Sequence, residues 1–343
     1  MSGDATACIL GCAGLSLAPD ERRFFREVQP WGFILFKRNI DTPDQVRALV
    51  QELRACVDRA HAPVLIDQEG GRVQRLGPPH WRRFPPGRAY GDLAGNDPLV
   101  RREITRLGAR LLAHDLAGLG INVDCVPVLD VPAPGGHEII GDRAYGDTVE
   151  AVASLGRAAA EGLIAGGVLP IIKHIPGHGR AKADSHLHLP VVEASADALD
   201  ERDFAPFRVL SDMPIAMTAH VVYAAFDHRR PATTSRKVIG DVIRGRIGFD
   251  GLLVSDDLSM KALDGDFTER AKASLAAGCD VVLHCNGDPA EMKAVVAGTR
   301  PLKGKAKARA AAALARLART AEPFDAEEGR ARFDAAFEGR WAA

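Results

Sequence analysis

The chain has 343 residues, enough to bury a large core as one large α/β domain or as two smaller ones. Its formal net charge of −1 gives no electric field that would attract nucleic acid or an anionic membrane, so we expect neither as a partner. No signal-peptide pattern opens the sequence, and no apolar run approaches the roughly 20 residues of a transmembrane helix. The six cysteines are scattered without a C-x-x-C pair, which indicates buried, reduced thiols, and together these features predict a cytoplasmic protein.

Short apolar runs alternate along the chain with segments of helical periodicity. Eight of the runs are predicted strands, in chain order Ala7–Gly14, Trp31–Lys37, Pro63–Asp67, Asn122–Asp130, Leu169–His174, Pro214–His220, Gly251–Asp256 and Asp280–His284. The predicted helices between and after them are Ala18–Gln29, Thr42–Ala60, 98–118, Thr148–Gly166, Asp197–Ser211, Ser235–Ile247, Thr268–Ala277 and Pro289–Ala297. A connection at 70–97 is rich in Pro, Gly and Arg, and two Ala/Arg-rich helices follow the last unit, at about 304–320 and 325–339.

The predicted strands lack two-residue alternation and have helices on both sides, which is typical of parallel strands buried on both faces. Eight such units in about 300 residues predict the α/β class and a (β/α)8 TIM barrel, a single catalytic domain at residues 1–300. Residues 301–343 would add helices packed on the barrel. The alternative is an open doubly wound sheet. However, neither G-x-G-x-x-G after the first strand nor G-x-x-x-x-G-K-[ST] occurs, which weakens a nucleotide-binding interpretation.

The stretch 169–190 begins as a strand and becomes a loop dense with titratable side chains. It holds four of the 11 histidines, and its glycines and prolines specify a loop shape that a solvated connector would not need. Polar residues lie at or just past the ends of other predicted strands too, so that the full set is Asp67, Asp130, Lys173, His174, His220, Asp256 and His284. Because parallel strands of a barrel bring their C-terminal ends to one face, these side chains predict an active site there, and therefore an enzyme.

Within the loop, Asp184 precedes His186 by two residues. A carboxylate at that spacing can hold one ring nitrogen and leave the other free to donate and accept a proton near neutral pH. The alternative is an exposed loop histidine beside an acidic neighbour. We expect the other two loop histidines, His178 and His188, to shape the loop.

A second candidate is the pair Asp256–Asp257 at the end of a predicted buried strand. One of two adjacent aspartates would face the barrel axis, where it can act as a nucleophile or a base. Asp257 can instead cap the segment that follows, a role less suited to Asp256. Other loops supply charged groups that suit a polyhydroxylated ligand, unless they form only surface ion pairs: Asp67, Arg72, Arg75 and Arg143.

Three long motifs stand out: Lys173-His174-Ile-Pro-Gly-His178-Gly-(x)4-Asp184-Ser-His186, Ile66-Asp-Gln-Glu-Gly-Gly-Arg-Val-Gln-Arg75 and Val254-Ser-Asp-Asp-Leu-Ser-Met260. They resemble, in the family's own order, motifs of glycoside hydrolase family 3, and the resemblance covers roughly residues 7–300. More narrowly, the chain is similar to the bacterial single-domain β-N-acetylglucosaminidases of peptidoglycan recycling.

The resemblance implies a (β/α)8 barrel and a retaining exo-β-N-acetylglucosaminidase that works through a covalent glycosyl-enzyme. It assigns the nucleophile to Asp256 and the acid/base to His186, with Asp184 as its partner. The residues that it places around the non-reducing N-acetylglucosamine are Asp67, Arg75, Arg143, Lys173 and His174. The implied substrate is the fragment N-acetylglucosaminyl-1,6-anhydro-N-acetylmuramic acid, with or without peptide. We expect a monomer that needs neither cofactor nor metal.

In this scheme a histidine replaces the usual acid carboxyl, so the separation of about 5–5.5 Å between the two carboxyls of retaining enzymes cannot be applied. Because His186 lies on the loop 177–189, we hypothesise that the loop closes over bound substrate before the chemistry. A trapped glycosyl-enzyme with His186 far from the anomeric carbon would contradict this.

Several alternatives remain open. The spacing His186-x-His188 suits a metal-dependent hydrolase, although Arg180 and Lys182 in the same loop favour anionic or hydroxyl partners over a cation. A histidine acid/base does not repel phosphate, which allows a phosphorylase, and a β-glucosidase of the same family is a further possibility. The last alternative is a sugar-binding barrel without activity.

Overall fold

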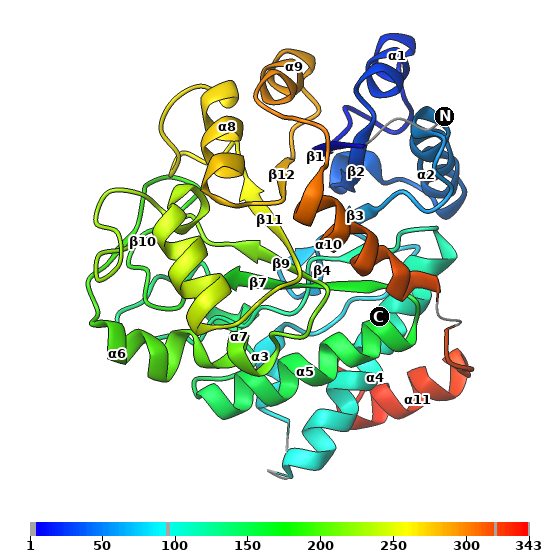
Figure 1. Ribbon diagram of the computed structural model, residues 1–343. Coiled ribbons are helices and arrows are strands. Elements are labelled where there is room, and N and C mark those ends of the chain that lie inside the picture. Colours follow the sequence, from blue (N-terminus) through cyan, green and yellow to red (C-terminus); the bar gives the residue numbers. More distant parts are fainter. Residues whose placement is uncertain (1–4, 94–96, 319–320, 342–343) are drawn as a thin grey trace.

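The computed structural model describes residues 5–93, 97–318 and 321–341. At its centre eight parallel strands close into a barrel, in the order β1-β12-β11-β9-β7-β6-β3-β2, with helices around the outside (Figure 1). These strands are β1 (Thr6–Leu10), β2 (Pro30–Leu35), β3 (Val64–Ile66), β6 (Val123–Asp124), β7 (Leu169–Ile175), β9 (Ile215–Thr218), β11 (Leu252–Asp257) and β12 (Val281–His284). Each overlaps one of the eight predicted strands, so the predicted (β/α)8 barrel is confirmed.

Helices connect the strands as the periodicity predicts. They are α1 (Pro19–Val28), α2 (Pro43–Val57), α4 (Pro98–Gly118), α5 (Val149–Ala165), α6 (Ala196–Ala198), α7 (Ala205–Val209), α8 (Phe267–Ala277) and α9 (Pro289–Ala297). Several begin at a side chain that accepts a hydrogen bond from a free backbone N–H of the first turn, as Thr42, Thr148 and Asp266 do. Such caps satisfy donors that have no partner within the helix, and they fix where each helix begins.

The structure differs from the expectation in the fourth strand and in two helices. β6 ends at Asp124 instead of continuing to residue 130, and the chain soon reaches Pro127, which has no N–H to donate to a ladder. The segments Leu199–Asp203 and Val238–Arg246 are π-helical, within regions predicted as plain helices. In the first of these, the N–H of Phe204 donates to the carbonyl of Leu199 at 2.9 Å.

The connection predicted at 70–97 contains regular structure that the sequence analysis missed. A short antiparallel hairpin joins β4 (Gln68–Gly70) to β5 (Val73–Gln74), and α3 (Gly87–Gly91) follows. The buried side chain of Gln68 holds the hairpin, because it accepts from the N–H groups of Arg75 and Leu76 and donates to the carbonyl of Leu76. A Cβ at Gly70, whose φ is +94°, would lie 2.2 Å from the carbonyl oxygen of Pro85, so only glycine fits there.

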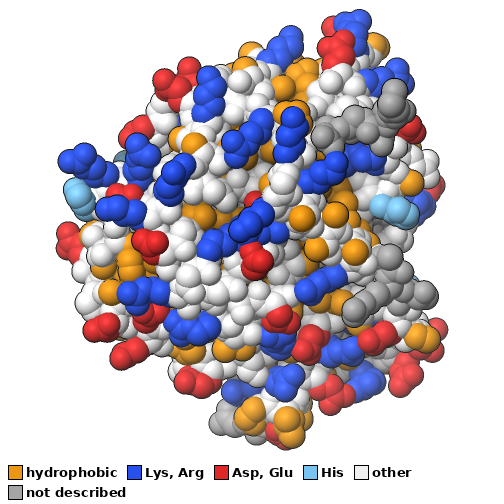
Figure 2. Space-filling model, in the orientation of Figure 1, with side chains coloured by type: hydrophobic (Ala, Val, Ile, Leu, Met, Phe, Trp, Pro, Cys, Tyr) orange, Lys and Arg blue, Asp and Glu red, His pale blue; other side chains and the backbone are white. Residues whose placement is uncertain are grey.

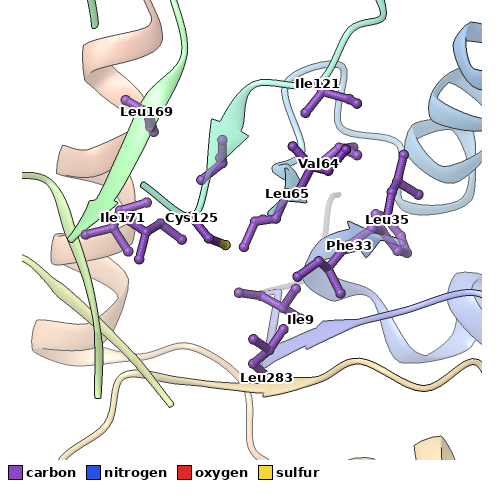
Figure 3. Packing of buried hydrophobic residues seen from close by; sticks show 14 of the residues in the cluster. Ile9, Phe33, Leu35, Val64, Leu65, Ile121, Cys125, Leu169, Ile171 and Leu283 are labelled. Carbon is purple, nitrogen blue, oxygen red and sulfur yellow. The ribbon is translucent and has the colours of Figure 1, made fainter. Parts of the chain in front are cut away.

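Apolar side chains from neighbouring strands pack together inside the barrel (Figure 3). They include Ile9, Phe33, Leu65, Cys125, Ile171 and Leu283, all buried. This close-packed apolar interior holds the strands rigidly, and it therefore also fixes the positions of the polar groups at their C-terminal ends. All six cysteines are buried and unpaired, as predicted.

Two helices lie outside the eight units, α10 (Gly304–Ala315) and α11 (Ala326–Ala336). The predicted helix 304–320 ends in a 3-10 turn at Arg316–Ala318, and residues 319–320 lie outside the described residues. α10 packs near the N-terminal ends of two strands, where Arg309 pairs with Asp250 and Asp280. Lys and Arg side chains gather on the face that carries α10 (Figure 2). We propose that 1–300 form the catalytic barrel and 301–343 an addition packed on it.

α11 lies against α4 and against the connection that follows the hairpin (Figure 1). Its Phe333 contacts Phe84 and Tyr90, and Phe337 meets Tyr90 edge-on with ring centroids 5.4 Å apart. Arg82 adds an ion pair to Asp334. The C-terminal helix therefore supports the segment that leads away from Arg75. None of the helices within the described ranges combines the length and the apolar character needed to span a membrane.

Candidate active site

A cavity of about 310 Å³ lies at the C-terminal ends of the barrel strands. Seven of the eight residues predicted for the site line it: Asp67, Arg75, Arg143, Lys173, His174, His186 and Asp256. The eighth, Asp184, is hydrogen-bonded to His186. The structure thus brings all eight together. Of the other strand-end residues, His220 and His284 are buried and do not line the cavity.

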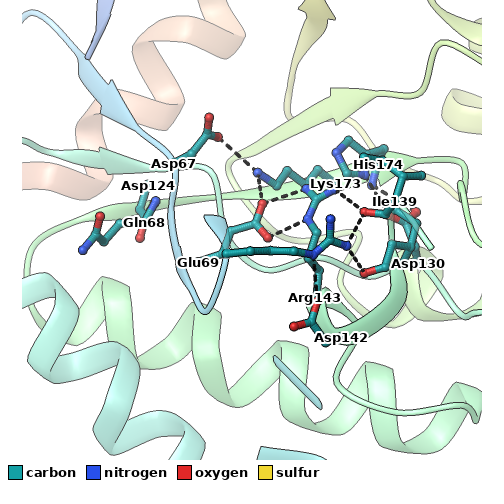
Figure 4. Close-up of polar contacts among 12 residues, drawn as sticks. Asp67, Gln68, Glu69, Asp124, Asp130, Ile139, Asp142, Arg143, Lys173 and His174 are labelled. Carbon is teal, nitrogen blue, oxygen red and sulfur yellow. Dashed lines mark hydrogen bonds and ion pairs between the residues drawn. The ribbon is translucent and has the colours of Figure 1, made fainter. Parts of the chain in front are cut away.

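Lys173 lies at the centre of a buried ion-pair network on one side of the cavity. Its Nζ is 3.2 Å from Oδ1 of Asp67 and 2.7 Å from Oε1 of Glu69 (Figure 4). The other carboxylate oxygen of Asp67, Oδ2, lies 2.9 Å from Nη2 of Arg75. Burial alone would raise the pKa of the Asp67 carboxyl, but Lys173 and Arg75 outweigh it and hold that pKa well below its ordinary value. These groups are therefore fixed in their charged forms.

Arg143 is held by the same network through two parallel hydrogen bonds. Its Nε and Nη2 donate to the two carboxylate oxygens of Glu69, each at 2.8 Å, and its Nη1 donates to the carbonyl of Ile139. Such bidentate pairs fix direction as well as charge. Glu69 was not assigned a role from the sequence, although alternation from Asp67 into β4 puts Asp67 and Glu69 on one face and Gln68 on the other. That alternation is the signal that could have found it.

His174 is oriented by Asp130, a second residue without an assigned role. Its Nδ1 is 2.7 Å from Oδ2 of Asp130, and Oδ1 accepts from the backbone N–H of His178 at 2.6 Å. Burial would raise the pKa of Asp130, but the nearby His174 outweighs it and lowers that pKa. With Nδ1 engaged, Nε2 is the ring nitrogen of His174 left for a ligand.

The two aspartates at the end of β11 have different surroundings. Oδ1 of Asp256 accepts from the N–H of Asp257 at 2.8 Å, whereas Oδ2 accepts no hydrogen bond from the residues that the structure describes. Burial would raise the pKa of Asp256, yet His220 and then His174 outweigh it and lower that pKa, so the carboxylate is ionised near neutral pH. Asp257 accepts from the N–H groups of Ser259 and Cys285, which is the capping role considered for it.

The predicted pair of Asp184 and His186 is formed. Nδ1 of His186 is 2.8 Å from Oδ1 of Asp184, and the backbone N–H of His186 donates to the same oxygen at 2.9 Å. The His186 side chain is 56% exposed, and it borders the cavity. His188 does not line the cavity.

Comparison with known proteins decides the family. Residues 16–320 match the model of the glycosyl hydrolase family 3 N-terminal domain. The chain belongs to glycosyl hydrolase family 3. It is 39% identical over 282 residues to a Beta-hexosaminidase of Alkalilimnicola ehrlichii, covering 81% of this chain and 80% of that protein. A Beta-hexosaminidase of Methylobacillus flagellatus is 37% identical over 313 residues, covering 90% and 87%.

A solved structure extends the likeness over nearly the whole chain. NagZ from Neisseria gonorrhoeae in complex with N-trifluoroacetyl-D-glucosamine superimposes with a TM-score of 0.85 at 32% identity, and 99% of each chain is covered. The protein is therefore a family 3 glycoside hydrolase, as its motifs predict. The structure adds Glu69 to this family 3 site, and it gives the strand-end residue Asp130 a role as the partner of His174.

Proposed function

We propose that the protein is a retaining exo-β-N-acetylhexosaminidase that removes non-reducing terminal N-acetylglucosamine from peptidoglycan fragments. One observation carries the proposal: the ionised Asp256 and His186, which is hydrogen-bonded to Asp184, border the same cavity as a fixed network of charged groups. The relatives named Beta-hexosaminidase and the NagZ complex with a glucosamine derivative support the choice of sugar.

The charges around the cavity suit a neutral, polyhydroxylated ligand. Cationic and acidic side chains line the cavity in similar numbers, the cations being Arg38, Arg72, Arg75, Arg143 and Lys173 and the acids Asp67, Glu69, Asp256 and Asp257. A site so balanced attracts neither anions nor cations strongly but presents many directed donors and acceptors. Its volume of about 310 Å³ lies at the lower end of the roughly 300–1,000 Å³ usual for ligand sites, which favours one terminal sugar.

The proposed reaction has two steps. In the first, Oδ2 of Asp256 attacks the anomeric carbon, the glycosidic C–O bond breaks, and His186 gives its proton to the leaving oxygen. In the second, His186 takes a proton from water, whose oxygen attacks the same carbon and releases the Asp256 carboxylate. Asp184 holds the imidazole by Nδ1 and stabilises its protonated form, which is present before the first step and after the second.

The test compares hydrolysis of an aryl β-N-acetylglucosaminide with that of an aryl β-glucoside. We expect the wild type to prefer the N-acetylglucosaminide, and Asp256→Ala to lose turnover by several orders of magnitude. His186→Ala should also lose turnover, whereas His188→Ala on the same loop should retain it. Preference for the glucoside would overturn the choice of sugar. Faster turnover in phosphate than in a non-anionic buffer would point to phosphorolysis.

A further inference from the structure

One side chain is buried in the part of the loop that carries Asp184 and His186. Of residues 182–189, only Ser185 is buried, and it stands between the two members of the pair. Its hydroxyl oxygen is 3.1 Å from Nε2 of His178, a histidine that is itself only 3% exposed. The neighbours of Ser185 on the loop therefore take their position from this buried serine.

His178, in turn, is fixed to the barrel. Its backbone N–H donates to Asp130, the carboxylate that also orients His174. The carbonyl of Gly177 just before it accepts from the hydroxyl of Tyr223 at 2.6 Å. A Cβ at Gly179 just after it would lie 2.0 Å from the carbonyl oxygen of Val131. These contacts fix the start of the loop against the barrel.

Within the described part of the chain, the contact with Ser185 is the one hydrogen bond of the His178 ring. Nδ1 is buried and has no hydrogen-bond partner among the described residues. Burial lowers the pKa of His178 to about 4 despite the nearby Asp130, so the ring is neutral at neutral pH and does not repel a protonated His186. A polar ring is costly to bury unless it makes a hydrogen bond, and the bond that this ring makes is the one to Ser185.

We propose that His178 and Ser185 form a clasp that positions the Asp184–His186 pair for proton transfer. Both are positioning residues, and the inference rests on the proposed function, in which His186 is the acid/base. Apart from the clasp, His186 is held by Asp184 and by its own carbonyl, which accepts from Lys261 at 3.3 Å. Without the clasp, the imidazole should remain on the loop but no longer stay within reach of the glycosidic oxygen.

The clasp predicts a dependence on the leaving group. Ser185→Ala removes one oxygen, and we expect kcat/KM for phenyl β-N-acetylglucosaminide, whose leaving group needs a proton, to fall about 10- to 100-fold. For the dinitrophenyl analogue, whose leaving group departs without a proton, we expect a fall of no more than about threefold. Ser185→Thr and His178→Gln, which keep a hydroxyl or a donor at the contact, should recover most of the loss.

Ser195→Ala, which removes the same hydroxyl from the exposed cap of α6, is the matched control and should affect both substrates equally and little. Equal losses of kcat/KM on the two substrates for Ser185→Ala, or no loss on either, would overturn the clasp. A wild type inactive on both substrates would instead overturn the proposed function. Thermal unfolding of each variant, measured alongside, separates loss of folded protein from loss of proton transfer.

Discussion

Asp124 lies at the end of β6, near the ion-pair network of Lys173, and its carboxyl is fully buried. Oδ1 accepts from the N–H of Gln68 at 2.9 Å, and Oδ2 has no partner among the described residues. Burial raises the pKa of this carboxyl from 3.8 to about 8, against a smaller opposing effect of the Gln68 N–H. The folded protein therefore holds a proton at neutral pH that the unfolded chain releases.

The stability consequence has a definite sign. Because the folded pKa is the higher one, the favourable contribution is complete below the ordinary pKa and is lost as the pH rises through the folded pKa. Between the two values the free energy of unfolding should fall by about 1.4 kcal/mol per pH unit from this group. Asp124→Asn keeps the acceptor for the N–H of Gln68 and has no proton that titrates in this pH range. The difference between variant and wild type should therefore move by about 2.7 kcal/mol in favour of the variant from pH 5 to pH 7.

Urea unfolding of both proteins at the two pH values measures this difference. Burying an amide in place of the carboxyl also changes the free energy of unfolding. This change is the same at both pH values, so it cancels when the two differences between variant and wild type are compared. Asp44→Asn, an exposed substitution on α2, is the control for the exchange itself and should follow the wild type at both pH values. If the wild type and Asp124→Asn differ by the same amount at both pH values, Asp124 is already ionised in the folded protein and the reasoning from burial is wrong.

Three further outcomes can be measured. Glu69→Gln leaves Lys173 and Arg143 without their shared anion, so unfolding should become easier by roughly 3–5 kcal/mol, and kcat/KM should fall while the surface variant Glu138→Gln changes neither. Asp130→Asn should lower kcat/KM about tenfold or more, because an amide partner can hold His174 in the wrong tautomer; an unchanged rate would contradict the orienting role. Burial raises the pKa of the thiols, that of Cys12 to about 12, so alkylation at neutral pH should label the native protein slowly and all six thiols after unfolding, as counted by mass spectrometry.

The barrel was predictable because its signal is repeated and local. Runs such as Leu169–His174 and Gly251–Asp256 begin with several apolar residues without alternation, and a loop and then a segment of helical periodicity follow each. Parallel closure then brings Lys173 and Asp256 to one face without further information. The early end of β6 was harder to predict. Its regular pairing stops within an extended apolar run whose sequence is typical of a longer strand.

What the sequence could not show depends on partners across loops. Asp130 looks like any other strand-end carboxylate until its bond to His174 is seen, and Ser185 looks like a spacer between two assigned residues. The raised pKa of Asp124 follows from the packing that surrounds it and not from its neighbours along the chain. These roles come from distances between segments, which residue spacing does not contain.

The aromatic contact between α11 and the segment after the hairpin can form only late in synthesis, because α11 comes near the end of the chain. Phe84 and Tyr90 leave the ribosome long before Phe333 and Phe337, the rings that cover them. Until α11 arrives, the nascent chain carries an uncovered apolar face next to the loop that holds Arg75. A chain stopped before residue 325 would keep all eight strands and every residue that lines the cavity, yet it would expose a surface that chaperones and proteases recognise. We therefore expect a chain that terminates shortly before α11 to be bound by chaperones or degraded, as a misfolded protein would be.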